Sequence, residues 1–471
     1  MRYKKEVSAE ERHLMMTTHP VGGLILKMSL PTISTMLVNS LYNMVDTYFV
    51  SKISISASAA VGIVFPLFAI IQALSMMFAL GGGSFIARKL GEGDVDTANR
   101  TLSTSFILSI ICGSVIGIFS IIFLKPLMIF LGATPTSLEY ASQYAFWVII
   151  ATPFFSASFV LNNCIRQEGS ANLAMFGMMI GTVINLILDP ILIFTFNLGI
   201  IGAAVATSIS QIVSCMILFV AVLRGKSVTK IKISLFTPSK EILGEIFRIG
   251  APAFFRQGLH SISAIMLNNA ASVYGDIALG SMSIVNKLMG VIFTVLMGFG
   301  HGFQPVCGYN YGAKKYSRII KAFSFSMKVC IAAILLLGTA GYIFAPQIVS
   351  LFRSDNPEII RIGTAIMRAN FIVLPLVAFT TVSNMMFQSC GQPVQAAVIA
   401  LSRNGICLIP MVLLLPRLFQ LQGVIYAQPA ADILTFLITV PMSVHILKQF
   451  LNTPDDTVFS VASKIGSKSK I

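Results

Sequence analysis

Long apolar segments recur along the whole chain, and each is close to the roughly 20 residues that a helix needs to cross a bilayer. Charged residues make up only 11% of the 471 residues, against about 25% in a typical soluble protein. The sequence therefore predicts an all-α polytopic membrane protein that lies in a lipid bilayer. Twelve transmembrane helices are expected near residues 24–50, 60–85, 103–124, 141–165, 171–196, 199–223, 243–273, 280–305, 320–345, 366–389, 395–415 and 422–448.

Basic residues fall unevenly on the two sides of the predicted membrane. When the gaps between the twelve segments are assigned alternately to two sides, the side with both termini has 24 lysines and arginines and the other side has 6. Cytoplasmic loops of membrane proteins are enriched in these residues, so both termini are expected in the cytoplasm. This orientation accounts for the formal net charge of +15, and no nucleic-acid partner is expected.

The two halves of the chain resemble each other at a constant spacing. Three landmarks recur 221 residues later, Pro31 as Pro252, Gly91 as Gly312 and Gly202 as Gly423. A constant offset at distant positions indicates an internal repeat. Because six spans is an even number, the two copies have the same orientation. They are expected to be related by an axis along the membrane normal, with a central cavity between them.

This repeat predicts two pseudo-symmetric lobes of six helices each. The predicted divisions are a cytoplasmic N-terminal segment (1–23), an N-lobe (24–223), a cytoplasmic linker (224–242), a C-lobe (243–448) and a cytoplasmic C-terminal tail (449–471). Since one chain holds both lobes, a monomer is expected to be functionally complete.

A carboxylate lies inside the apolar segment 171–196. Asp189 follows Asn185 by four residues, so the two share one helix face. A charge at this depth is costly and is usually retained for a function. Pro190 cannot donate to the helical ladder and leaves a carbonyl free as a further oxygen ligand. A purely structural hydrogen-bonding role for Asp189 is the alternative.

Two further oxygen-bearing residues are expected at a similar depth. Asp189 lies about 18 residues into its span, roughly 27 Å at 1.5 Å per residue. Asp46 lies near the outer end of the first span and Thr207 near the start of the sixth. Asp46, Asn185, Asp189 and Thr207 are predicted to hold Na⁺ or a shared proton. Asp46 could instead extend to the outer membrane interface.

The C-terminal half has a different set of polar residues within its predicted spans. They are Arg256, His260, Lys287, Arg403 and Asp432. Lys287 and Asp432 are at similar predicted depth and are expected to pair. The set can be interpreted as a polar network that fixes the helix bundle, or as a gate or a site for an anionic substrate. His301, between two glycines, is expected to face a loop.

Several local motifs together resemble those of the multidrug and toxin extrusion (MATE) transporters, in the DinF-like and MepA-like prokaryotic branches. The resemblance covers about residues 24–448. The motifs are Ser29-Leu30-Pro31, Asn43-Met44-Val45-Asp46-Thr47, Ala87-Arg88-Lys89-Leu90-Gly91, Arg166-Gln167-Glu168-Gly169, Asn185 to Pro190, and Gly308-Tyr309-Asn310-Tyr311-Gly312-Ala313.

The resemblance implies a V of two six-helix lobes, alternating access, and cation-coupled antiport in the inner membrane of a prokaryote. It assigns the cation site to Asp46, Asn185, Asp189 and Thr207, with Tyr42, Asn162 and Asn163 in support. The NorM-like branch has an acidic pair in its C-lobe, and this chain lacks it. A C-lobe cation site is therefore not expected.

The predicted function is secondary active efflux of amphipathic, cationic small molecules, driven by H⁺ or Na⁺. The chain has no phosphate-binding motif GxxxxGK[ST], and neither enzymatic activity nor a cofactor is expected. The alternatives are a lipid-linked saccharide flippase of the same superfamily and an exporter of an anionic substrate. An intramembrane aspartyl protease using Asp46 and Asp189 is disfavoured by Pro190, which follows Asp189. Carboxylates at matched depth argue against a non-transporting scaffold or receptor.

Overall fold

The computed structural model describes residues 8–352 and 356–455. Their regular structure is helical throughout. The first part comprises α1 (Ala9–Thr18), α2 (Val21–Ser51), α3 (Ile55–Gly91), α4 (Val95–Ile122), α5 (Leu124–Phe130), α6 (Leu138–Ile150), α7 (Thr152–Gln167), α8 (Ala171–Pro190), the π-helical turn η1 (Ile191–Thr195) and α9 (Gly199–Leu223). The second part comprises η2 (Ile233–Leu235), α10 (Lys240–Ser272), α11 (Asp276–Gly312), α12 (Tyr316–Ile343), α13 (Ala345–Ser350), α14 (Pro357–Ser389), α15 (Pro393–Leu401), the π-helical turn η3 (Ser402–Ile406) and α16 (Leu408–Asn452).

The protein is a multi-pass membrane protein. Nine helices among the described residues are long and apolar enough to cross a bilayer, and the pair α6–α7, bent by 50°, makes a tenth. α10 is not among them because Arg256, Gln257 and His260 lower its hydropathy. Residues 393–452 are counted as a single membrane-crossing helix, although the backbone departs from helical geometry at Gln420 (φ 52°, ψ −132°). Adding α10 and dividing this stretch at Gln420 gives the twelve predicted spans.

The helices extend beyond the predicted spans. α3 and α11 each continue for about a turn or more past both ends of the segments 60–85 and 280–305, because hydropathy marks only the part inside the bilayer. The N-terminal segment contains a helix, α1, which hydropathy did not indicate. Residues 1–7 and 456–471, including several basic residues that supported the predicted orientation, lie outside the described residues.

Local sequence signals fix where several helices begin. The side chain of Ser54 accepts a hydrogen bond from the Ala57 backbone N–H (3.0 Å) at the start of α3. Asp94 caps α4 and Ser239 caps α10 in the same way, which satisfies backbone donors that have no partner in the helix. The polar connection between the halves runs over residues 224–239, between α9 and α10.

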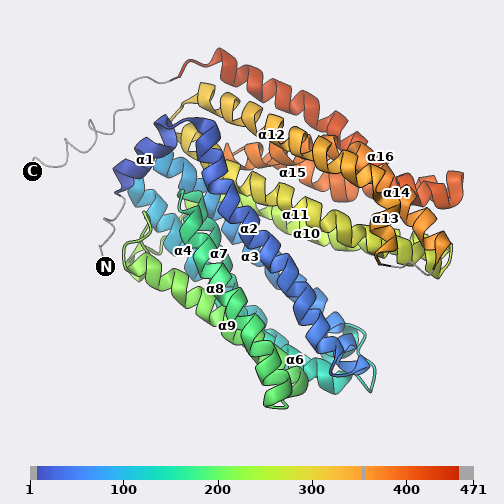
Figure 1. Cartoon of the computed structure of the whole chain (residues 1–471). Coiled ribbons are helices and arrows are strands. Elements are labelled where there is room, and N and C mark those ends of the chain that lie inside the picture. The colour runs from blue at the N-terminus through green and yellow to red at the C-terminus, as the bar shows by residue number, and fades with distance from the viewer. Residues whose placement is uncertain (1–7, 353–355, 456–471) are drawn as a thin grey trace, which may run out of the picture.

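The two lobes lie close together at one end and diverge toward the other, so the chain forms a V (Figure 1). At the closed end α10 packs against α3 and α11 packs against α2. Gly81 of α3 lies directly against the Ile246 carbonyl, and Gly302 of α11 lies against Ser29. A β-carbon at either glycine would overlap the neighbouring helix. The two glycines are 221 residues apart, so the same close contact occurs in both halves.

The short helix α1 bridges the lobes at the closed end. Arg12 donates from Nη1 to the carbonyl of Gly169 (2.8 Å) in the N-lobe. The His13 Nδ1 lies 3.0 Å from the Leu90 carbonyl. Because a carbonyl oxygen only accepts, this nitrogen carries the proton. Three C-lobe side chains donate to carbonyls at the other end of α1: Asn310 to Met16 (3.1 Å), Lys315 to Thr17 (3.2 Å) and Arg318 to His19 (2.7 Å).

A buried carboxylate just after α7 holds the connection between the lobes in place. Glu168 is fully buried and accepts hydrogen bonds from Ser227 Oγ (2.6 Å), Thr229 Oγ1 (2.7 Å) and Thr229 N (3.0 Å). Burial raises the pKa of Glu168, and these hydrogen bonds partly oppose that shift. The connection is therefore attached to the N-lobe rather than loose.

Candidate functional site

Two carboxylates face each other inside the N-lobe. Asp46 comes from α2, and Asp189 comes from the last turn of α8, which packs against α2. The Asp189 side chain is fully buried, and the two carboxyl groups are near enough to interact directly. In a low-dielectric interior, two adjacent carboxylates strongly disfavour both being ionised. A proton or a bound cation would relieve that repulsion.

The amide of Asn185 orients Asp189. Its Nδ2 donates to Asp189 Oδ1 over 3.2 Å, one turn along α8. A carboxylate accepts and does not donate, so the amide nitrogen must point toward it. The Asn185 oxygen therefore points away from the carboxylate and is available to another ligand.

Within residues 8–352 and 356–455, each of the four residues predicted to bind the cation has one buried oxygen without a hydrogen-bond partner. These atoms are Asp46 Oδ1, Asn185 Oδ1, Asp189 Oδ2 and Thr207 Oγ1. Buried polar atoms are normally paired, so four unpaired oxygens among neighbouring residues are unusual. Carboxylate, amide and hydroxyl oxygens are ligands of hard cations. The residues present therefore fit Na⁺, and the carboxylates also fit a proton.

The backbone is irregular directly after Asp189. α8 ends at Pro190 and continues into the π-helical turn η1, in which the Phe196 N–H bonds the Ile191 carbonyl (2.9 Å). Pro190 has no N–H, so the Leu186 carbonyl lacks its helical donor. Such π-turns are frequent at functional sites.

Three of the four predicted cation ligands, all but Asp189, line a cavity of about 510 Å³ within the N-lobe. It is lined by Tyr42, Asp46, Asn185 and Thr207, together with Tyr144 of α6 and apolar residues that include Phe65 and Phe68. Tyr144 interacts electrostatically with both carboxylates. The sequence did not indicate Tyr144, because only the tertiary packing of α6 against α3 and α9 brings this side chain to the cavity.

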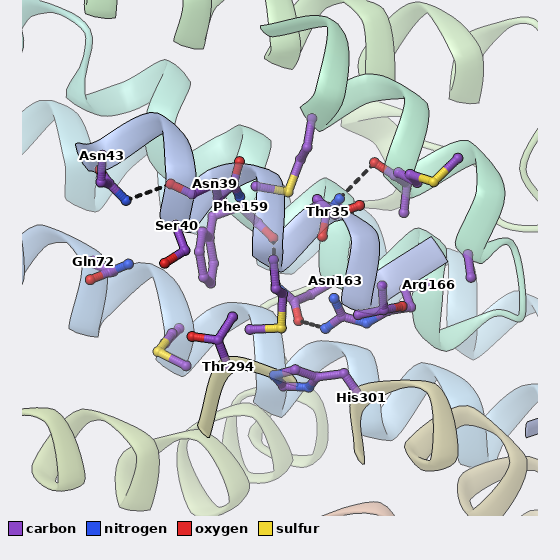
Figure 2. Close-up of a pocket in the computed structure, with 18 residues that line it drawn as sticks. Thr35, Asn39, Ser40, Asn43, Gln72, Phe159, Asn163, Arg166, Thr294 and His301 are labelled. Carbon is purple, nitrogen blue, oxygen red and sulfur yellow. Dashed lines mark hydrogen bonds between the residues drawn. The ribbon is translucent and has the colours of Figure 1, made fainter. Parts of the chain in front are cut away.

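Asn162 and Asn163 lie at a second cavity, of about 370 Å³, rather than beside the carboxylates. Asn162 Nδ2 donates to the Ala174 carbonyl (2.9 Å), and Asn163 accepts from Arg166. Figure 2 shows Arg166 and His301 pointing into the same space. The two cavities adjoin, because Asn39, Asn43, Gln72, Phe159 and Met178 line both.

The prediction that His301 faces a loop is wrong. Its side chain is buried between the lobes, with Nδ1 2.9 Å from Gln304 Oε1. Gln304 also accepts from Gln167 (3.3 Å) and donates to Gln388 (3.1 Å). His301 is buried because α11 continues through the glycines on either side of it and packs against α2 and α14. Arg166, which follows the predicted span 141–165, lies in the last turn of α7 and is buried.

The predicted pairing of Lys287 with Asp432 is also wrong. Among the described residues the ion pair of Asp432 is with Arg403, whose Nε lies 2.9 Å from Asp432 Oδ1. The guanidinium of Arg403 also lies over the Phe293 ring, 4.8 Å from its centroid. Lys287 is exposed on α11. The predicted depth of Lys287 and Asp432 in the membrane did not show which face of its helix each side chain occupies. Arg403 reaches Asp432 of α16 because it lies in the π-helical turn η3, which directs its side chain toward that helix.

Comparison with known proteins identifies the family. The sequence profile of the MatE family matches residues 31–191 and 252–414, which together are more than half of the chain. The two matched segments begin 221 residues apart, the spacing of the sequence landmarks. The chain belongs to the MatE family, the multidrug and toxin extrusion transporters, and is a membrane transporter rather than an enzyme.

Particular relatives are similar over almost the whole length. Multidrug export protein MepA of Staphylococcus aureus (strain MSSA476) is 30% identical over 439 residues, 92% of this chain and 95% of that protein. MepA of Staphylococcus saprophyticus is 28% identical over 431 residues, 91% of this chain and 94% of that protein. A solved structure of a multidrug resistance MATE transporter in its outward-facing conformation matches with a TM-score of 0.87 at 26% identity, covering 96% of this chain and 100% of that one. A MOP superfamily transporter from Pyrococcus furiosus matches with the same values.

Proposed function

We propose that this protein exports amphipathic, cationic drug-like molecules in exchange for H⁺ or Na⁺, and that Asp46, Asn185, Asp189 and Thr207 bind the coupling ion. The observation that carries the proposal is the set of four buried, unpaired oxygens, one on each residue. Two of these oxygens belong to the carboxylates of Asp46 and Asp189, which interact with each other inside the N-lobe. A single chain holds the whole site, so a monomer is sufficient.

The substrate binds in the two adjoining cavities between and within the lobes. Their volumes of about 510 and 370 Å³ are in the range of pockets for drug-sized ligands. Phenylalanine and methionine side chains beside amides suit apolar molecules of varied shape. The relatives that are named multidrug export proteins support this substrate class.

The V faces the outside of the cell in this conformation. Both described ends of the chain lie at the closed end of the V (Figure 1), and the excess of basic residues assigns that end to the cytoplasm. The protein then lies in the inner membrane of a prokaryote with both termini cytoplasmic. α1 covers the cytoplasmic face, where the lobes must separate when the protein opens inward.

Ion binding and drug binding are coupled through α2 and α8. Asp46 on α2 and Asp189 on α8 repel each other when both are ionised, and binding of the ion allows the two helices to approach. The same helices carry Asn39 and Thr182, which form a hydrogen bond (2.9 Å) at the wall of the cavity. A change in the spacing of α2 and α8 therefore changes the shape of the drug site.

Uptake of ethidium by proteoliposomes tests the proposal. The lumen is made acidic in one preparation and rich in Na⁺ in another, so that the ion leaves as the dye enters. We expect uptake under one or both gradients, and none in the double variant Asp46→Asn, Asp189→Asn. Asp96→Asn is the matched control, because its carboxylate is exposed at the start of α4 and pairs with Arg100.

Full gradient-driven uptake by the folded double variant would contradict the proposed site. Absence of ethidium uptake under either gradient, in folded wild-type protein, would favour the other candidate functions. These are export of an anionic substrate and flipping of a lipid-linked saccharide. The basic residues of the C-lobe are the observation that supports them.

A further inference from the structure

The connection between the lobes, residues 224–239, carries basic residues and no acidic one. The basic residues are Arg224, Lys226, Lys230 and Lys232. Within the part of the chain that the structure describes, the ammonium groups of Lys230 and Lys232 have neither an ion-pair partner nor a hydrogen-bond partner. Their charge is therefore available to an anionic group outside the chain.

An apolar side chain is exposed directly beside these two lysines. Ile233 follows Lys232 at the start of η2 and is 87% exposed. Ile231, between the two lysines, is buried in the hydrophobic core, so the segment is held against the protein while Ile233 faces away from it. A single exposed apolar side chain needs no explanation on a surface in water. The meaning of Ile233 therefore depends on its depth relative to the membrane.

Hydrogen bonds to α4 fix the depth of this segment. Asn99 Oδ1 accepts from the Lys230 N–H (2.7 Å). Ser103 Oγ accepts from the Lys232 N–H (3.3 Å). The apolar span predicted within α4 begins at residue 103, so the two lysines and η2 lie level with the boundary between the hydrocarbon and the lipid head groups. The segment lies beside α4 at the closed end of the V (Figure 1).

We propose that residues 230–235 bind an anionic phospholipid, whose head group contacts Lys230 and Lys232 while Ile233 inserts among the acyl chains. Lysines close to a membrane surface attract anionic lipids, and their apolar stems let the charged ends reach the head groups. Charge complementarity selects this ligand, since two cations beside an exposed apolar side chain match an anionic head group above acyl chains. In the orientation proposed above, the lipid belongs to the cytoplasmic leaflet.

Buried contacts connect this lipid site to the place where the lobes meet. Glu168 accepts hydrogen bonds from Ser227 and Thr229, directly before Lys230. The backbone carbonyl of Glu168 accepts from the hydroxyl of Tyr309 in the C-lobe (3.1 Å). A lipid bound at Lys230 therefore attaches the N-lobe to the membrane surface beside a contact between the two lobes.

A fluorescent probe at position 233 tests whether this residue contacts lipid. The thiol of Ile233→Cys is labelled with nitrobenzoxadiazole, and wild-type protein treated in the same way sets the background, because six of the seven native cysteines are buried. Nanodiscs contain a fixed fraction of the quencher 5-doxyl phosphatidylcholine, with or without phosphatidylglycerol. We expect quenching that phosphatidylglycerol strengthens about twofold or more. Equal quenching in the two lipids would overturn the proposal. Absence of quenching would also overturn it and would leave Ile233 to a protein partner.

Removal of the two charges tests whether they hold the head group. Native mass spectrometry of the purified protein gives the affinity for the first bound phosphatidylglycerol. We expect the double variant Lys230→Gln, Lys232→Gln to weaken it about tenfold or more, from the attraction of each lysine to anionic lipid. The double variant Lys321→Gln, Lys328→Gln is the matched control, because it removes two exposed charges from the regular helix α12.

The control variant should bind phosphatidylglycerol nearly as well as the wild-type protein. Equal losses in the two double variants would overturn the proposal, since they would assign the binding to overall positive charge. Both measurements record lipid binding without an ion gradient or a transported dye. A failure of the lipid site can therefore be told from a failure of the transport proposal, which the ethidium experiment tests.

Discussion

Asn185 and Asp189 form a hydrogen bond of 3.2 Å, Nδ2 to Oδ1, along one face of α8. The other oxygen of each residue, Asn185 Oδ1 and Asp189 Oδ2, has no hydrogen-bond partner among the residues that the structure describes. The bond fixes the rotamer of a carboxylate that is fully buried, so the direction of the unpaired oxygens depends on it.

Removal of this hydrogen bond should weaken ion coupling. A hydrogen bond to a charged group contributes about 1.5–3 kcal/mol, and 1.4 kcal/mol corresponds to a factor of about ten in an equilibrium constant. We expect Asn185→Ala to raise the ion concentration for half-maximal dye transport at least about tenfold. Asn370→Ala is the matched control, because that amide donates to the Ile366 carbonyl of its own helix. Equal effects of the two variants would contradict a specific role for Asn185.

The ion pair between Arg403 and Asp432 should dominate the local stability of the C-lobe. The Asp432 side chain is only 3% exposed, and removal of one partner of a buried pair costs about 3–5 kcal/mol. We expect Arg403→Leu to lower the thermal unfolding midpoint markedly, and Asp432→Leu in the same chain to restore most of the loss. Arg361→Leu should have little effect, because its pair with Glu358 is exposed. A double variant no more stable than the single variant would contradict this prediction.

Loss of the Glu168 carboxylate should release the connection between the lobes. In Glu168→Ala the buried donors of Ser227 and Thr229 lose their acceptor, and each unsatisfied donor costs about 1–3 kcal/mol. Trypsin should then cut after Lys226 and Lys230 about tenfold faster or more, because cleavage follows the open population. Glu92→Ala serves as control, since Glu92 is paired on the surface with Lys89. Unchanged cleavage in Glu168→Ala would show that other contacts hold the connection.

The attachment of α1 should weaken in acid. Burial, together with Lys315, lowers the pKa of His13 below its ordinary value of 6.5, so the attached helix holds the neutral ring and the detached helix binds a proton more readily. Stability from this contact is complete above about pH 6.5 and falls as the pH drops toward the lowered pKa. Hydrogen exchange of the α1 amides, corrected for intrinsic rates, should be faster at about pH 5.5 than at about pH 7.5.

His13→Asn tests whether His13 causes that pH dependence. Asparagine retains a donor near the position of Nδ1 but does not titrate. We expect the exchange of α1 to become nearly independent of pH in this variant. The same acid-induced increase in His13→Asn would assign the effect to another group.

The shared helix face of Asn185 and Asp189 could be predicted from the sequence because of local helical geometry. Asn185 and Asp189 are one turn apart, so any helix through residues 171–190 puts them on one face, and span order gave the depth of Asp46 and Thr207. The same reasoning failed for Lys287, since equal depth does not fix the direction of a side chain. It also failed for His301, because glycines suggested a loop where α11 is continuous.

The sequence by itself determined the helical membrane architecture and the two-fold repeat, because hydropathy and a constant offset follow from residue order alone. Only the tertiary structure decided which polar groups meet. Tyr144 lies at the carboxylate cavity and Arg403 pairs with Asp432, whereas Arg256 has no ion-pair partner within the described part of the chain. These outcomes depend on helix rotation, on the break at Gln420 and on the π-helical turns. Each of these changes the direction of a side chain without changing the hydropathy pattern.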